Sequence, residues 1–264
     1  MQKMLHGAWL YRHYIGSAIS AEFRNRFARS RLGGLWMILH PLAQVAIFAL
    51  ILSTVLAARL PGIDNRFAYA IYLSAGILAW TLFAELVNGG LNLFISQGNL
   101  MKKIAFPRIC LPLINLGTAL VNHLSLLLAI LVLFTILGHP PTVDWLWLPV
   151  PMFFLAALGL GLGLVLGILN VFLRDIGQLV PILLQFGFWL TPIVYMADLL
   201  PTWAQPYLAL NPVQPLVAAY QDILAFQQSP EWTMMGGSIV VAGLGLALAM
   251  FLFRRADAEM VDAL

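Results

Sequence analysis

The sequence predicts an all-α membrane protein with six transmembrane helices, and two observations lead to this class. Of the 264 residues, 61% are hydrophobic and 9% are charged, and the mean hydropathy is +0.90, whereas soluble domains are about one quarter charged. A helix needs about 20 apolar residues to cross a bilayer, and six stretches meet this length. The expected spans cover residues 35–57, 68–92, 110–137, 148–172, 176–195 and 235–253. We therefore expect one membrane domain over residues 1–264.

The distribution of basic residues predicts how the domain is oriented. Six spans place both termini on one side of the membrane. If that side is the cytoplasm, Arg59 and Arg66 are the only members of the 14 Lys and Arg residues that lie outside. Cytoplasmic loops retain Lys and Arg, so we expect cytoplasmic termini. Helical spans further indicate a bacterial inner membrane, because outer-membrane proteins are usually barrels.

Residues 1–34 are expected to form an amphipathic helix and a short entrance segment before the first span. Ile15, Ile19, Phe23 and Phe27 follow one another at four-residue intervals, while arginines occupy other positions. An apolar stripe of this kind is typical of a helix lying in the membrane interface.

Two connecting segments also carry patterns of their own. Residues 99–108 are short and basic and contain Pro107, which predicts a small cytoplasmic helix. Residues 196–234 are too apolar for an ordinary outer loop and are punctuated by prolines. This pattern predicts two short re-entrant or interfacial periplasmic helices, broken at Asn211-Pro212. Span six and a cytoplasmic tail then occupy residues 235–264.

Several chemistries have no visible motif in the chain. There is no Gly-Lys dipeptide and hence no phosphate-binding loop of the Walker type. Catalytic His or paired-carboxylate motifs are likewise missing, and Cys110 is the single cysteine, so neither catalysis nor a metal site is expected. Glu85 is the one carboxylate well inside an expected span, which leaves an ion-driven carrier as an alternative.

Four motifs follow one another along these elements. They are Phe23–Trp36 followed by His40-Pro41, Lys102–Arg108 followed by Leu111-Pro112, Asn170–Ile176, and Thr191–Tyr195 followed by Asn211-Pro212. In this order they resemble ABC-2 type permeases that export O-antigen, capsule and teichoic acid polysaccharides, and the resemblance covers nearly the whole chain. Such permeases commonly carry an arginine after the Asn-Pro segment, where this chain has Gln221.

The resemblance implies a permease subunit and not an enzyme. It implies two copies of the chain meeting across spans one and five, with one ATP-binding subunit docked under each copy. ATP and Mg would be bound by that partner, with no cofactor in this chain and no nucleic acid as a ligand. The cargo would be a lipid-linked polysaccharide, such as undecaprenyl-diphosphate-linked O-antigen. Alternatives are an exporter of small lipophilic compounds and a membrane-embedded glycan-modifying enzyme, the latter depending on His40 or His123.

Two stripes of aromatic and amide side chains are candidates for lining a polymer channel. Aromatic faces suit sugar rings, and amides suit hydroxyl groups. Ordinary helix packing is the alternative reading of both stripes. The candidates are Trp36, His40, Gln44 and Phe48 in span one and Gln178, Gln185 and Trp189 in span five.

Three further sets of residues take candidate roles from the resemblance. Coupling to the ATPase falls to Asn99, Lys102, Lys103, Phe106, Pro107 and Arg108, although a solvated basic loop is the alternative. Attraction of the lipid head group falls to Arg24, Arg26, Arg29 and Arg31, although a surface anchor would need the same arginines. The candidate residues of the periplasmic gate are Trp203, Tyr207, Asn211 and Tyr220.

Overall fold

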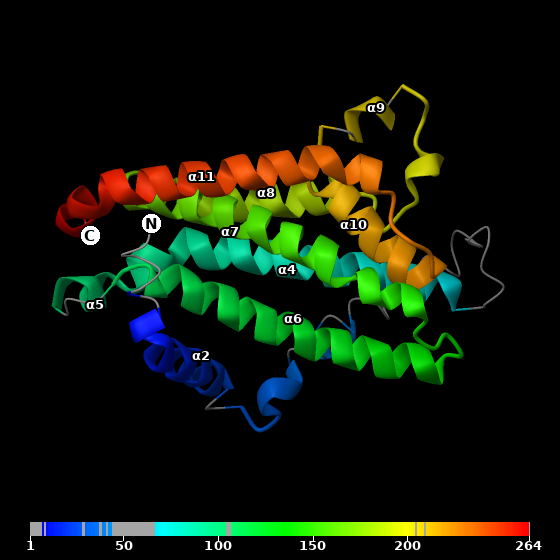
Figure 1. The fold of residues 1–264 in the computed structure, drawn as a ribbon, viewed down its shortest axis with the longest axis horizontal. Coiled ribbons are helices and arrows are strands. Elements are labelled where there is room, and N and C mark those ends of the chain that lie inside the picture. Colours follow the sequence, from blue (N-terminus) through cyan, green and yellow to red (C-terminus); the bar gives the residue numbers. More distant parts are fainter. Residues whose placement is uncertain are drawn as a thin grey trace.

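The computed structural model describes residues 7, 9–27, 30–36, 39, 40, 42, 43, 67–103, 107–203, 205–208 and 210–263. These ranges contain helices joined by turns and irregular segments, without a strand (Figure 1). The long helices are α4 (Ala68–Ser96), α6 (Cys110–Ile136), α7 (Pro149–Phe172), α8 (Ile176–Leu190) and α11 (Trp232–Ala263). The shorter helices are α2 (Arg12–Phe27), α5 (Gly98–Lys103), α9 (Gln205–Leu208) and α10 (Gln214–Gln221). Short turns complete the order: η1 (Gly33–Leu35), η2 (Val143–Trp147), η3 (Ala197–Leu199) and the π-helix η4 (Asp222–Phe226).

Four segments are long and apolar enough to cross a membrane. They are Ala68–Ser96, Cys110–Ile136, Val143–Phe172 and Trp232–Ala256. Each overlaps one of the expected spans, so these four are confirmed as long apolar helices. The first expected span, residues 35–57, lies mostly outside the described residues, and so do Gln44 and Phe48.

The fifth expected span is shorter in the structure than the sequence analysis predicted. Residues 176–195 were expected to be helical, but α8 has 15 residues and ends at Leu190. The cause is Pro192, because a proline disfavours the helical conformation of the residue before it. Thr191 is accordingly extended, with ψ at 133°.

Helix α4 forms the centre of the bundle. It packs against α6, α7, α8 and α10, and 78% of its apolar segment is buried, compared with 22% for α11. Most of the buried core side chains therefore surround α4, whereas α11 presents much of its surface outward (Figure 1).

Glycines bring α4 and α7 into backbone contact. A Cβ atom added at Gly163 would lie 2.6 Å from the carbonyl oxygen of Leu86, and one added at Gly90 would lie 2.6 Å from the carbonyl carbon of Gly163. Gly167 faces Gly90 in the same way one turn further along. Small residues at four-residue spacing allow this close approach between membrane helices.

Helix α2 packs on α6 with its isoleucine side. The side chain of Ile19 lies against Gly117, where α6 has no side chain to obstruct it. The hydrophobic residues of α2 are less segregated than the stripe in the sequence suggested. At 3.6 residues per turn, Glu22 falls on the same side as Ile15 and Ile19, so the face toward α6 carries a carboxylate. The side chains of Phe23 and Phe27 lie outside the described part of the chain.

Candidate functional site: a polar cavity beside the central helix

A cavity of about 930 Å³ opens between α2, α4, α6 and the segment around η1. Polar side chains make up a large share of its described lining residues. The polar and aromatic lining residues are Glu22, Trp36, His40, Trp80, Thr81, Glu85, Asn88, Asn115, Thr118, Asn122 and His123. The cavity thus brings together Trp36 and His40, two predicted channel residues, with Glu85, the carboxylate noted inside the second span.

Two polar stripes on apolar helices produce this lining. On α4, Thr81 and Glu85 are four residues apart and Asn88 follows after three. On α6, Asn115, Thr118 and Asn122 repeat at the same spacings. Residues three or four apart lie on one helix face, and α4 and α6 pack side by side. Of these residues the sequence analysis considered only Glu85, although the spacing of the amides within α6 was a signal that could have identified the others.

Hydrogen bonds join the helices that surround the cavity. The Asn122 amide Nδ2 donates to Glu85 Oε1, and the Thr118 hydroxyl donates to Glu22 Oε2 at 3.5 Å. Asn115 Nδ2 donates to the carbonyl oxygen of Leu86 at 3.4 Å. Carboxylates from α2 and α4 therefore meet amide and hydroxyl donors from α6.

Tryptophan rings form the other part of the lining. Trp36 is half exposed, and its Nε1 donates to Ser30 Oγ at 3.1 Å. Trp80 reaches from α4 toward α8, where its ring centroid lies 5.9 Å from that of Phe188. A Cβ atom added at Gly187 would lie 3.0 Å from the Trp80 ring, so Trp80 separates the cavity from α8.

The predicted channel residues of span five lie apart from the cavity. Gln178, Gln185 and Trp189 are exposed on α8, and none of them lines the cavity. They share the exposed surface of α8 with apolar residues, namely Leu179, Ile182, Leu183, Phe186 and Leu190. The two predicted stripes therefore do not meet within the described part of one chain, and their role as channel lining stays a prediction.

The candidate coupling residues lie on and after α5, at the same end of the bundle as the C-terminal end of α11 and opposite α9 (Figure 1). Lys102 is exposed, while its neighbour Met101 is 6% exposed and anchors α5 to the core. Pro107 and Arg108 are half-buried. The side chains of Asn99 and Lys103, and all of Phe106, lie outside the described residues.

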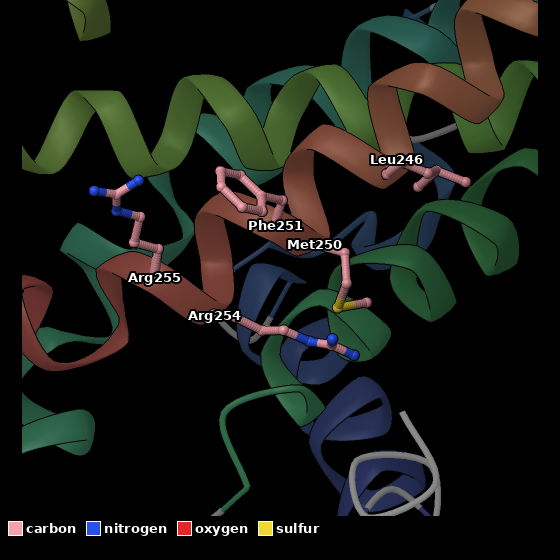
Figure 2. A pocket seen from close by; sticks show the side chains of 6 residues that line it. Leu246, Met250, Phe251, Arg254 and Arg255 are labelled. Carbon is pink, nitrogen blue, oxygen red and sulfur yellow. The ribbon is translucent and has the colours of Figure 1, made fainter.

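The structure describes the candidate head-group arginines only in part. Arg24 and Arg31 are exposed, whereas Arg29 and the side chain of Arg26 lie outside the described part. A hollow of about 700 Å³ on α11 is lined by Leu246, Ala247, Met250, Phe251, Arg254 and Arg255. In Figure 2 the guanidinium groups of Arg254 and Arg255 point away from each other.

The four candidate gate residues have different surroundings. Trp203 is 73% exposed and Tyr207 is 66% exposed. Asn211 is half-buried and begins α10: its Oδ1 accepts from Val213 N at 3.0 Å, and its Nδ2 donates to Thr191 Oγ1 at 2.9 Å. Tyr220 is fully buried, and its hydroxyl lies 3.1 Å from His123 Nε2. Tyr220 is thus part of the core, and its role in the periplasmic gate stays a prediction.

The extended segment 191–195 is held by side chains from α4 and α10. Gln221 Nε2 donates to the Pro192 carbonyl at 3.0 Å. The Tyr72 hydroxyl lies 3.3 Å from the same oxygen and 3.2 Å from the Tyr195 carbonyl, and the Tyr69 hydroxyl donates to the Val194 carbonyl. A chain that leaves the helical conformation inside a membrane protein must have such partners. Gln221 occupies the position where the permeases that this sequence resembles commonly carry an arginine. Here its side chain has a structural role.

Replacing Gln221 with Leu is expected to lower the free energy of unfolding by about 1–3 kcal/mol, because the substitution removes the shorter of the two hydrogen bonds to the buried Pro192 carbonyl. Thermal unfolding of the purified protein in detergent would measure the loss. Gln205→Leu is the matched control, since Gln205 is exposed and its side chain donates to the nearby Leu200 carbonyl. Equal stabilities of the two variants would contradict the role given to Gln221.

Comparisons with known proteins identify the family. A family model described as ABC-2 type transporter matches residues 14–225, and the chain belongs to this family. It is 28% identical over 261 residues to the O-antigen export system permease protein RfbA of Myxococcus xanthus, which covers 97% of this chain and 98% of that protein. It is 27% identical over 203 residues, 76% of each chain, to the protein of the same name in Klebsiella pneumoniae. The polysialic acid transport protein KpsM of Escherichia coli is 21% identical over 243 residues, which is 92% of this chain and 93% of that protein.

Proposed function

We propose that the chain is the permease subunit of an ATP-driven exporter that moves a lipid-linked polysaccharide across the bacterial inner membrane. Undecaprenyl-diphosphate-linked O-antigen is the cargo that we propose first. The observation that carries the proposal is the similarity to an O-antigen export permease over 97% of this chain. The polar cavity supports it, because a polymer of sugars needs hydroxyl-binding groups inside an otherwise apolar protein.

The proposed transporter contains two copies of the chain and two ATP-binding subunits. The exposed surface of α8 carries Gln178 and Gln185 among apolar residues, and polar side chains are costly against lipid. A second copy that covers α8 would remove these amides from lipid and place them beside the path of the polymer. The first expected span would join the same interface.

The proposed orientation places α5 and the C-terminal end of α11 in the cytoplasm. Lys102, Arg254 and Arg255 belong to these segments and Arg108 follows α5, in agreement with the retention of basic residues in the cytoplasm. The ATPase would dock on α5, and α9 and α10 would lie at the periplasmic side. The four expected spans present in the structure, together with α8 and residues 35–57, would make six.

Deletion of the gene in its host tests the function. We expect lipid-linked polysaccharide to accumulate on the cytoplasmic side and to disappear from the cell surface. The intact gene should restore export, but not in cells whose partner ATPase is inactive. A normal surface glycan in the deletion strain would reject the proposal and favour the alternative of a small lipophilic cargo.

A further inference from the structure

The cavity contains a buried hydrogen-bond acceptor that has no partner among the described residues. Asn122 is 8% exposed, and its Nδ2 is used by Glu85. Because a carboxylate can only accept, the nitrogen of this amide faces Glu85, and the remaining Oδ1 is the atom left without a donor. Leaving such an acceptor unsatisfied costs about 1–3 kcal/mol. Since Asn122 lines the cavity, an occupant that brings a donor would recover this free energy.

The charges of the lining favour one kind of occupant. Glu22 and Glu85 both face the cavity, and the described lining contains no Lys or Arg. An anion such as a diphosphate would be repelled. The two carboxylates, together with His40 and His123, do not form a cluster of metal ligands within the described ranges. A molecule that carries several hydrogen-bond donors and no negative charge fits these charges.

The tryptophans of the lining further restrict the class of molecule that fits the cavity. Trp36 and Trp80 line a space whose other described walls combine carboxylates, amides, hydroxyls and imidazoles with a few apolar side chains. A sugar ring combines apolar C–H faces, which pack on aromatic rings, with hydroxyl groups, which donate to carboxylates and amide oxygens. The volume of about 930 Å³ lies within the range of small-molecule sites, roughly 300–1,000 Å³.

We propose that this cavity binds an uncharged sugar unit of the exported polymer and excludes its diphosphate end. Asn122 Oδ1 and the carboxylates of Glu22 and Glu85 accept hydrogen bonds from the sugar hydroxyls, and the tryptophan rings pack on the sugar. The proposal rests on the proposed function and deepens it, because it assigns the glycan, and not the lipid head group, to a defined place in one protomer.

Binding to the permease in complex with its ATPase, held in lipid nanodiscs, tests the site. The probes are a neutral oligosaccharide released from the host polymer by mild acid and glucose 1-phosphate, each followed by saturation-transfer NMR. We expect the oligosaccharide to bind and the sugar phosphate to bind at least tenfold more weakly. Asn122→Leu should weaken oligosaccharide binding about tenfold.

Asn92→Leu is the matched control. Asn92 lies on α4 but is exposed and outside the cavity, and its Nδ2 donates to the Asn88 carbonyl at 3.1 Å. This variant should bind the oligosaccharide as the unaltered protein does. Oligosaccharide binding that is unchanged in Asn122→Leu, or weakened equally in Asn92→Leu, would overturn the proposal.

A second variant keeps the test decisive if Asn122→Leu does not fold. Glu85→Gln retains an acceptor for Asn122 but removes the negative charge. It should lower the preference for the neutral oligosaccharide over glucose 1-phosphate severalfold, which a purely structural role of Glu85 would not do. An unchanged preference would reject the site. If gene deletion blocks export while these binding results fail, the proposed function stands and only the glycan site is lost.

Discussion

Replacing Gly163 with Ala is expected to lower the free energy of unfolding by about 3 kcal/mol. The new Cβ atom would lie 2.6 Å from the Leu86 carbonyl oxygen and 3.0 Å from the Val87 Cα. Both are backbone atoms of α4, so no change of rotamer can make room and the two helices must separate. Overpacking of a close interface typically costs about 1–3 kcal/mol, and the contact with the central helix places this site at the upper end. Thermal or denaturant unfolding in detergent would measure the effect.

Gly243→Ala is the control for this prediction. Gly243 lies in α11, and a Cβ atom added there meets nothing within 4 Å. Since alanine favours a helix over glycine by about 1 kcal/mol, this variant should be as stable as the unaltered protein or slightly more stable. If Gly163→Ala were equally stable, the backbone contact between α4 and α7 would have to be rejected.

Replacing Lys102 and Lys103 with Glu is expected to release the ATP-binding subunit from the permease. Lys102 is exposed on α5, while buried Met101 holds this short helix in place. Reversal of charge at a surface that fits a partner typically costs several kcal/mol. We therefore expect the amount of ATPase recovered with the affinity-tagged permease to fall at least tenfold, with membrane insertion unchanged.

The charge-preserving variant, in which Lys102 and Lys103 are both replaced with Arg, separates docking from folding. It keeps the positive charge at both positions, so it should recover the ATPase as the unaltered permease does. Equal recovery of the ATPase with the Glu variant and the Arg variant would remove α5 from the proposed docking surface.

Much of the fold could be predicted from hydrophobic stretches and their bounding residues. The beginnings of α4 and α6 at Ala68 and Cys110 coincide with the expected spans, because each follows a polar or basic stretch. The early end of α8 could have been predicted as well, from Pro192. The apolar residues Ile193 and Val194 after Pro192 made the helix look longer than it is. Hydrophobicity alone does not show where a backbone stops being helical.

The candidate site was predictable only in part. Trp36, His40 and Glu85 could be noted from the sequence, but their gathering in one cavity depends on the rotation of α4 and α6 about their axes. A single sequence does not give that rotation. Tyr220 received its gate role from the resemblance, and that role stays a prediction. Its burial beside His123 could not be predicted, because it depends on how α10 and η4 pack into the core against α4.

The hydrogen bonds around residues 191–195 have a consequence for how the protein is made. Pro192 and Val194 are buried, and a buried carbonyl left without a donor costs about 1–3 kcal/mol. Tyr69 and Tyr72 precede this segment by about 120 residues and are already synthesised when it leaves the ribosome. Gln221 is made 29 residues later. The nascent chain can therefore complete these hydrogen bonds only after α10 has emerged. A translational pause before residue 221 would leave the Pro192 carbonyl without its bond from Gln221.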